Sequence, residues 1–268
     1  MSVRGLLVLC GLIWGGAGLA EPRLPSDCIA LAGNAAAVTP ARFGPASADQ
    51  VLVRYLDHAE FAIATRTLLA VTDYRGTIGN PAVVPDVVTM NNAHDTHYTD
   101  HPDPRIPLVL RGWPVDGNPA AYDLDLGEMR IRNVTTDLRG PFGEGARRDG
   151  NSIFIFEAAG LCIGHLSHLH QIPSAAQYAA IGRLDVVMVP VDGAYTMDVV
   201  AMAGVVRHLH PRIVLPMHWF SPEGLARFLV QMKPDFTISV ADGPEILVSR
   251  PTLPARPMVV VLQPALFE

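Results

Sequence analysis

The ten histidines are the residues of this sequence best suited to chemistry, and most of them occur in groups. The neutral imidazole nitrogen binds zinc and other borderline transition metals. One group contains His94, His97 and His101, a second contains His165, His168 and His170, and the other four are His58, His208, His210 and His218. If the fold brought some of these side chains together, they could hold a metal ion.

Several of these histidines directly follow segments that we predict to be buried strands. His94 and His97 come after the strand predicted at 83–90, and His218 comes after the one predicted at 213–216. His168 lies a few residues beyond 161–163. Open α/β sheets place ligand-binding groups at the ends of their strands. We therefore expect imidazoles from three distant parts of the chain to meet at one edge of the fold.

The segment 86–97, DVVTMNNAHDTH, resembles the strand and metal-binding loop of the metallo-β-lactamase superfamily, whose motif is His-x-His-x-Asp-His. Further segments follow in the superfamily's order and are similar to the branch that contains ascorbate-phosphate lactonases and N-acylphosphatidylethanolamine phospholipases: 55–61, 72–73, 151–168 and 214–218. The resemblance covers residues 50–235.

The sequence departs from the superfamily motif at several metal-binding positions. Aligned on His97, the motif has Asn92 where the first histidine should be and Thr96 where the aspartate should be. His168 stands where the family has its bridging aspartate, and 133–137 offers no histidine for the middle position. An alternative frame that uses His97 and His101 has one residue too many between the two histidines.

The resemblance implies a metal site made by His94, His97, His168 and His218. Four neutral nitrogens suit one zinc ion, or another transition metal, better than calcium or magnesium, and the altered motif puts a second ion in question. His58 is expected to orient a metal ligand through its other ring nitrogen. Asp95, Asp137 and Asn92 are the catalytic candidates: either aspartate could serve as a base, and Asn92 could hydrogen-bond the water.

Other histidines have simpler interpretations. His208 and His210 lie at the end of a predicted helix, where a cation is favoured by the helix dipole. His165 and His170 flank His168, and strand alternation would send one of them to the opposite face. His101 lies in a loop rich in proline and aspartate.

Three functions are consistent with these residues, and the weakest of them is redox or transfer chemistry at iron or manganese. The first is an exported metal-dependent hydrolase that uses a metal-bound water on a small ester, lactone, amide or phosphoester. The second is a metal- or ligand-binding accessory protein that has lost catalysis, because four side chains on one tetrahedral ion would fill its coordination shell.

The order of predicted elements indicates an α/β protein. Strands dominate the first half, and helices at 174–183, 197–209 and 222–232 alternate with strands at 185–191, 213–216, 246–249 and 258–262 in the second half. The charged, glycine-containing segment 139–151 is predicted to be an exposed loop. This order, together with the resemblance, implies a four-layer αβ/βα sandwich: two packed mixed sheets with outer helices.

The first twenty residues have the pattern of a secretory signal peptide: Arg4, an apolar run and small residues before Glu21. We expect a loose lead-in at 21–49 and a single domain at 50–268, periplasmic or secreted, with no membrane span after cleavage. Removal of the signal peptide changes the net charge from −6 to −7 because it removes only Arg4. An acidic surface argues against nucleic acid as a partner. Cys28 and Cys162 remain and could form a disulfide or stay separate thiols.

Overall fold

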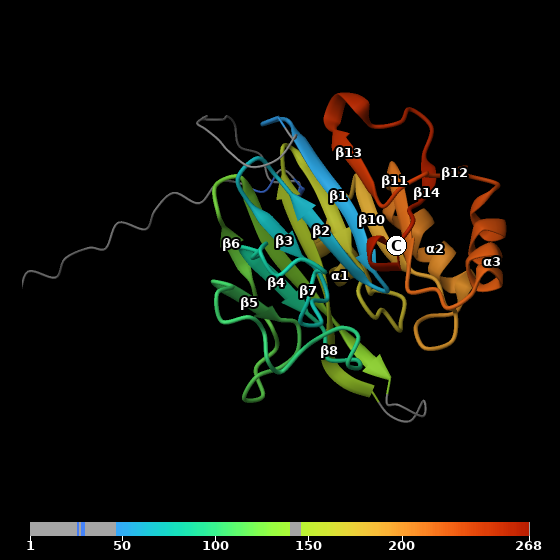
Figure 1. Ribbon diagram of the computed structural model, residues 1–268. Helices are drawn as coiled ribbons and strands as arrows, with labels where there is room; N and C mark the ends of the chain where they lie inside the picture. The colour runs from blue at the N-terminus through green and yellow to red at the C-terminus, as the bar shows by residue number, and fades with distance from the viewer. Residues whose placement is uncertain (1–25, 27, 30–46, 140–145, 268) are drawn as a thin grey trace, which may run out of the picture.

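Two mixed sheets form the body of the computed structural model, which describes residues 26, 28–29, 47–139 and 146–267. The first sheet has six strands in the order β13-β1-β2-β3-β4-β5 (Figure 1). These strands are β1 (Gln50–Asp57), β2 (Glu60–Ala64), β3 (Leu69–Val71), β4 (Val87–Met90), β5 (Leu108–Arg111) and β13 (Glu245–Ser249). β3, β4 and β5 run parallel, and the other pairs are antiparallel.

The second sheet has eight strands in the order β12-β14-β11-β10-β9-β8-β7-β6. These strands are β6 (Asp123–Asp125), β7 (Met129–Arg139), β8 (Ala146–Ala158), β9 (Leu161–His165), β10 (Val186–Pro190), β11 (Ile213–Met217), β12 (Thr237–Val240) and β14 (Met258–Val261). The pairs from β6 to β9 are antiparallel, whereas the pairs β9–β10, β10–β11, β11–β14 and β14–β12 are parallel. The parallel half contains the nearly continuous apolar runs expected of strands that are covered on both faces.

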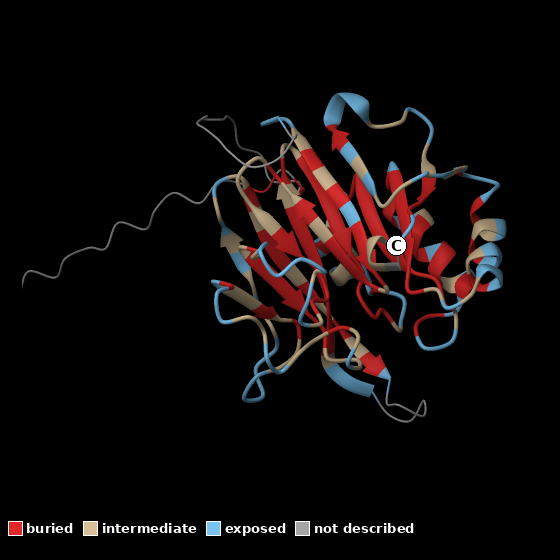
Figure 2. Ribbon diagram, in the orientation of Figure 1, coloured by how far each residue is buried: buried red, intermediate tan, exposed pale blue. Residues whose placement is uncertain are grey.

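The two sheets pack face to face over an apolar core. Tyr55 and Phe61 of the first sheet stack with ring centroids 4.6 Å apart, and Phe154, Phe156 and Met188 reach the same core from the second sheet. These inner faces are buried, whereas pale blue exposed residues concentrate on the loops and on the outer face of α3 (Figure 2).

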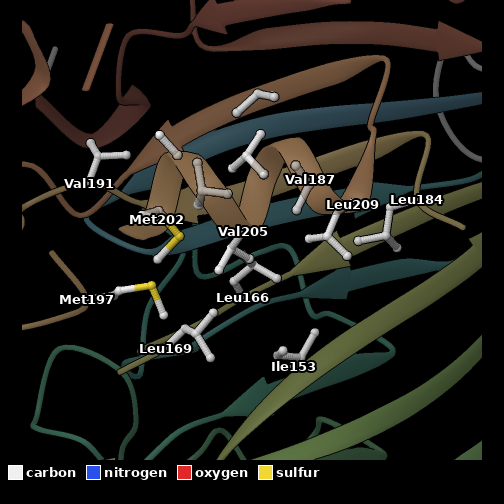
Figure 3. Packing of buried hydrophobic residues seen from close by; sticks show 14 of the residues in the cluster. Ile153, Leu166, Leu169, Leu184, Val187, Val191, Met197, Met202, Val205 and Leu209 are labelled. Atoms are coloured by element: carbon white, nitrogen blue, oxygen red, sulfur yellow. The ribbon is translucent and has the colours of Figure 1, made fainter. Parts of the chain in front are cut away.

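Three helices cover the outer face of the eight-stranded sheet: α1 (Ala175–Ile181), α2 (Val199–Leu209) and α3 (Pro222–Met232). Figure 3 shows Met202, Val205 and Leu209 of α2 among the buried residues that join this helix to the sheet. Ser174 caps α1 by a reciprocal pair of bonds with Gln177, as its place in the sequence predicts.

The covering of the outer face of the six-stranded sheet differs from the layer of helices that was predicted. Among the described residues, no α-helix packs there. Leu56, Val71 and Met90 are covered by loop residues such as Tyr74 and by Leu266 from the short 3-10 helix η2 (Ala265–Phe267). The two packed mixed sheets of the predicted fold are therefore confirmed, but the outer α-helices lie on one side of the sandwich.

The prediction of a loop at 139–151 is wrong for both ends of this segment, which are strands. β7 continues to Arg139, and β8 begins at Ala146, with Arg139 paired to Ala146. Arg147 and Arg148 are exposed because this part of the pair projects beyond the packed sheets, so its polar composition did not indicate a strand. The 83–90 strand begins only at Val87, and β5 and β12 were not predicted.

A disulfide joins Cys28 to Cys162. The sequence had left open whether these two cysteines form a disulfide or stay separate thiols. The neighbouring lead-in residues are also attached to the eight-stranded sheet, since Ser26 Oγ donates to Glu157 and Arg183 N donates to the Cys28 carbonyl. The predicted signal peptide at 1–20 and most of the lead-in lie outside the described residues. None of the described helices is long and apolar enough to cross a membrane.

Candidate metal centre

Five histidines gather where strands from both sheets end. His58 lies in the turn between β1 and β2, and His94 and His97 lie in the loop after β4. His168 follows β9 and His218 directly follows β11, both in the other sheet. His58 and His218 lie directly at strand ends, whereas His94, His97 and His168 lie in the segments that follow β4 and β9. The expected meeting of distant imidazoles is thus observed.

His58, His94, His97 and His218 each offer a ring nitrogen, and these four atoms lie within 4.8 Å of one another. The rings of His97 and His218 stack with centroids 5.1 Å apart, and the His58 ring is 4.1 Å from that of His218. His168 is at the same place, with its ring centroid 4.9 Å from that of His97, although its nitrogens do not complete this set.

Two buried carboxylates hold the inner histidines in position. His97 Nδ1 is 2.6 Å from Asp73 Oδ2, and His218 Nδ1 is 3.0 Å from Asp192 Oδ1. In both rings the other nitrogen, Nε2, is fully buried and has no hydrogen-bond partner, and the same is true of His58 Nε2. A buried ring nitrogen without a partner costs free energy unless something binds it. Carboxylate–histidine pairs with one free nitrogen are the arrangement that protein metal sites use.

The two carboxylates have different environments. Burial raises the pKa of Asp73 to about 6, against the opposing effects of nearby histidines and of Ser167, whose hydroxyl donates to both of its oxygens. Burial also acts to raise the pKa of Asp192, but hydrogen bonds from His218, Thr196 and backbone amides outweigh it, and the pKa of Asp192 lies below its usual value. Neither sequence motif nor spacing had assigned these two aspartates a role.

The backbone around the site adopts the left-handed region at four non-glycine residues: His58 (φ 45°), Asp73 (φ 42°), Ser167 (φ 48°) and His218 (φ 54°). Such residues are uncommon and cluster at functional sites, where surrounding contacts maintain them. One of these contacts links the sheets, because the His58 carbonyl accepts from His218 N at 2.7 Å and from the Tyr55 hydroxyl at 2.8 Å.

Burial keeps the imidazoles of His58, His94, His97 and His168 neutral. Burial, followed by the neighbouring histidines, lowers the pKa of His58, His97 and His168 well below the usual value. Burial and His218 also lower the pKa of His94. Neutral rings retain a free lone pair at pH 7, which metal binding requires.

Asn91 and Asn151 belong to a polar network behind the metal loop. Asn151 is fully buried, and its Oδ1 accepts from Asn91 Nδ2 at 2.7 Å and from His168 N at 3.0 Å. Its Nδ2 donates to Thr136 Oγ1. Asn151 thus connects the metal loop to the segment after β9. Asn151 lies in the segment 151–168 that is similar to the superfamily branch, but nothing in the sequence marked it as a residue of the site.

The catalytic candidates from the sequence lie around the cluster rather than in it. Asp95 is exposed, Asn92 bonds Arg147 through its side chain and carbonyl, and Asp137 accepts from Asp149 N at 2.9 Å. Their catalytic roles stay predictions.

The remaining histidines lie outside the group of ligand atoms. His165 is buried and bonds the Ala59 carbonyl through Nε2. His208 stacks on Tyr178 in the last turn of α2, His210 is the left-handed residue that ends this helix, and His101 is exposed.

The residues present fit a divalent transition metal. Four imidazole nitrogens could bind it, and the Asp73 and Asp192 carboxylates would balance its two positive charges when both are ionised. The three buried Nε2 atoms without partners are the feature of the described chain that a metal would explain.

A cavity of about 670 Å³ adjoins this centre. His58 forms part of its wall, together with Tyr55, Asp57, Trp219, Phe220, Asp242, Gln263 and Pro264. Trp219 and Phe220 directly follow His218, so the same strand end supplies a cluster residue and an aromatic wall. Its lining combines the aromatic rings of Tyr55, Trp219 and Phe220 with polar side chains such as Asp57, Asp242 and Gln263, and a concave site of this kind can hold a small molecule.

Comparison with known proteins agrees with this geometry. Residues 52–218 match the family model described as the beta-lactamase superfamily domain. The chain belongs to the metallo-β-lactamase superfamily.

Individual relatives are distant. A UPF0173 protein from Pyrococcus furiosus is 28% identical over 103 residues, which are 36% of this chain and 41% of that protein. The chain thus matches less than half of this relative's length. A metallo-β-lactamase superfamily protein from Thermotoga maritima has a similar structure, with a TM-score of 0.59, 22% identity, and coverage of 79% of this chain and 98% of the other. An isothiocyanate hydrolase from Delia radicum gut bacteria has a TM-score of 0.51 at 12% identity, with 74% and 99% of the two chains covered. At these identities, the likeness concerns the fold.

Proposed function

We propose that this protein is an exported, zinc-class hydrolase whose metal is held by His58, His94, His97 and His218. The observation that carries the proposal is the set of buried Nε2 atoms without partners at His58, His97 and His218, two of them backed by carboxylates. This ligand set differs from the set implied by the resemblance, because His58 takes a ligand position and His168 lies beside the metal.

A zinc-class ion held by these four nitrogens would supply a Lewis acid, and it would activate water near neutral pH if that water were bound as a fifth ligand. The chain itself contributes the rest of the site. Asp73 and Asp192 hold the ring nitrogens of His97 and His218, and the bond from His218 N to the His58 carbonyl joins the two sheets at the site. The cavity beside His58 would admit a small ester, lactone, amide or phosphoester with an apolar portion against Trp219 and Phe220.

Export is part of the proposal and is supported by the first twenty residues and by the Cys28–Cys162 disulfide. Expression of the full chain in a bacterium, followed by cell fractionation and mass measurement, tests it. The expected product is exported and lacks residues 1–20. Full-length protein retained in the cytoplasm would contradict export.

Hydrolysis is tested with metal-reconstituted protein on a panel of chromogenic esters, lactones, amides and phosphoesters. We expect at least one class to be hydrolysed, and the rate to fall by about 100-fold or more in His218→Ala. His101→Ala is the matched control, because this histidine is exposed and outside the cluster. A metal-replete protein without activity toward any class would contradict a hydrolase.

A second candidate, a metal-binding protein without catalysis, is favoured by the number of histidines in the cluster. Four protein ligands on a tetrahedral ion leave no position for water. X-ray absorption spectroscopy of the zinc form would separate the two functions. Four nitrogen ligands alone favour the accessory protein, whereas an additional oxygen ligand favours the hydrolase.

A further inference from the structure

A chain of hydrogen bonds leads from the backbone of β7 to the histidine cluster. Arg139 N donates to His170 Nδ1 at 2.6 Å, and His170 Nε2 is 2.6 Å from His168 Nδ1. His168 Nε2 in turn is 3.1 Å from His94 Nε2, and His94 Nδ1 is 2.8 Å from Thr96 Oγ1. Only the first of these bonds has an unambiguous direction, because a backbone N–H can donate but cannot accept.

This direction fixes the tautomers of the neutral rings along the chain. His170 Nδ1 must accept, so the proton of His170 is on Nε2, which donates to His168 Nδ1. His168 Nδ1 therefore accepts, and the proton of His168 is on Nε2. That N–H points at His94 Nε2, which accepts and leaves the His94 proton on Nδ1 for Thr96 Oγ1. Burial, which disfavours the charged form of His168, is consistent with neutral rings.

We propose that His168 is a fixed hydrogen-bond donor facing the metal site, and that it is not a metal ligand. His170 and the Arg139 amide are the groups that position it, because they hold the proton on Nε2. This inference rests on the metal site of the proposed function. If His94 held a metal through Nε2, His168 Nε2–H would lose this acceptor and would be available to a carbonyl or phosphoryl oxygen of the substrate.

Ligation by His168 Nε2 would need the opposite tautomer. The proton would then move to His168 Nδ1, and His170 would have to accept through Nε2 and carry its own proton on Nδ1. That N–H would face the Arg139 amide, so two donors would oppose each other at 2.6 Å. The other four histidines already offer enough nitrogens for a tetrahedral ion, so ligation by His168 is not required.

At the position of His168, this site presents a hydrogen-bond donor where the superfamily has a hydrogen-bond acceptor. The resemblance places a bridging aspartate, an anionic acceptor, at the position of His168. A neutral N–H donor at this position selects a substrate with an acceptor oxygen beside the metal. Removal of such a donor from a hydrolytic site lowers kcat by roughly 100-fold.

The tautomer is tested by nitrogen NMR of the full, metal-free protein labelled with ¹⁵N-histidine. The His168 ring signals are assigned as those that vanish in His168→Gln. We expect Nδ1 of His168 to have the shift of an unprotonated ring nitrogen and Nε2 that of a protonated one. In His170→Phe the bond to Nδ1 is lost, and the Nδ1 shift should move. A protonated Nδ1 in the wild type would overturn the proposal.

The zinc content of two variants provides a second, independent test, in which the folding of each variant is measured. We expect His168→Gln to bind as much zinc as the wild type, whereas His218→Ala loses it, with circular dichroism confirming both folds. Equal loss of zinc in the two variants would make His168 a ligand and overturn the proposal. Both tests are independent of turnover, so a protein that hydrolyses nothing contradicts the proposed function without affecting either result.

Discussion

At the residue scale, two aspartates determine how the histidines of this site are aimed. Asp73 and Asp192 each bond one ring nitrogen of a buried histidine and leave the other nitrogen facing the cluster. Because the rings lie in a region of low dielectric constant, these negative charges also favour a cation strongly. Orientation and charge thus come from residues that do not themselves need to touch the metal.

Replacing either aspartate by asparagine is expected to weaken zinc binding by about 10- to 100-fold, because the charge is lost while the side-chain size is kept. Competition with a chromogenic chelator measures the affinity. Asp116→Asn, at an exposed loop position, is the matched control. Unchanged affinity in both Asp73→Asn and Asp192→Asn would show that these contacts do not support a metal site.

The sequence predicted part of this site. Histidines after buried strands indicated His94, His97, His168 and His218, and the structure brings all four together. The position of His58 was also predicted, but its ligand role was not, because its closeness to the other sheet depends on a turn conformation with positive φ. Asp73 lies in the matching segment 72–73 and Asp192 in none, but only the folded chain shows that both acids lie behind the rings.

At the element scale, hydrogen bonds between buried side chains and backbone groups connect the two sheets near the metal loop. Asn151 on β8 joins β7, the loop after β4 and the segment after β9 through hydrogen bonds made in a fully buried position. The metal loop therefore depends on the eight-stranded sheet, although it follows a strand of the other sheet.

Asn151→Ala is expected to lower the free energy of unfolding by about 2–3 kcal/mol, because it leaves buried groups without partners. Urea denaturation monitored by circular dichroism measures the loss. Asn118→Ala, at an exposed position, should change the stability by less than about 0.5 kcal/mol. Similar effects of the two substitutions would indicate that the buried network contributes little.

Glu128 links the turn before β7 to the turn after β2, and thus one sheet to the other. Burial acts to raise its pKa, but hydrogen bonds from Thr67, Thr65 and Arg66 outweigh burial and hold the pKa below its usual value of 4.5. A lowered pKa in the folded state means that ionised Glu128 stabilises the fold above pH 4.5 and that this contribution is lost as the pH falls through the folded-state pKa.

Glu128→Gln is therefore expected to destabilise the protein by about 1 kcal/mol at pH 7, and by less as the pH falls below 4. Urea denaturation at a series of pH values gives the difference between wild type and variant. A difference that stays constant from pH 7 to pH 3 would contradict a contribution from the ionised carboxylate.

At the scale of the whole molecule, the sequence predicted the two sheets well and their outer covering less well. Alternating or continuous apolar runs identified β1, β2, β10 and β11, because burial on one or both faces leaves such patterns. β12 is short and mostly exposed, and the outer face of the six-stranded sheet is covered by loops, so neither left a periodic signal. The projecting end of β7 and β8 was missed for the same reason.

The Cys28–Cys162 disulfide attaches the lead-in to the sandwich across 134 residues of sequence. A variant with both cysteines replaced by alanine is expected to lose about 2–4 kcal/mol of stability, because the unfolded chain regains the freedom of a long loop. Thermal unfolding measures the loss. Cys162 lies at the start of β9 and the metal site beyond its end, so zinc content should not change. An equal melting temperature would contradict a stabilising role.

Zinc stoichiometry tests the central claim most directly. Elemental analysis of purified, zinc-reconstituted protein should give about one ion per chain for the wild type, little for His97→Ala and His218→Ala, and the wild-type value for His101→Ala. A wild-type protein that retains no transition metal, or equal metal content in all four proteins, would show that the buried histidines do not form a metal site.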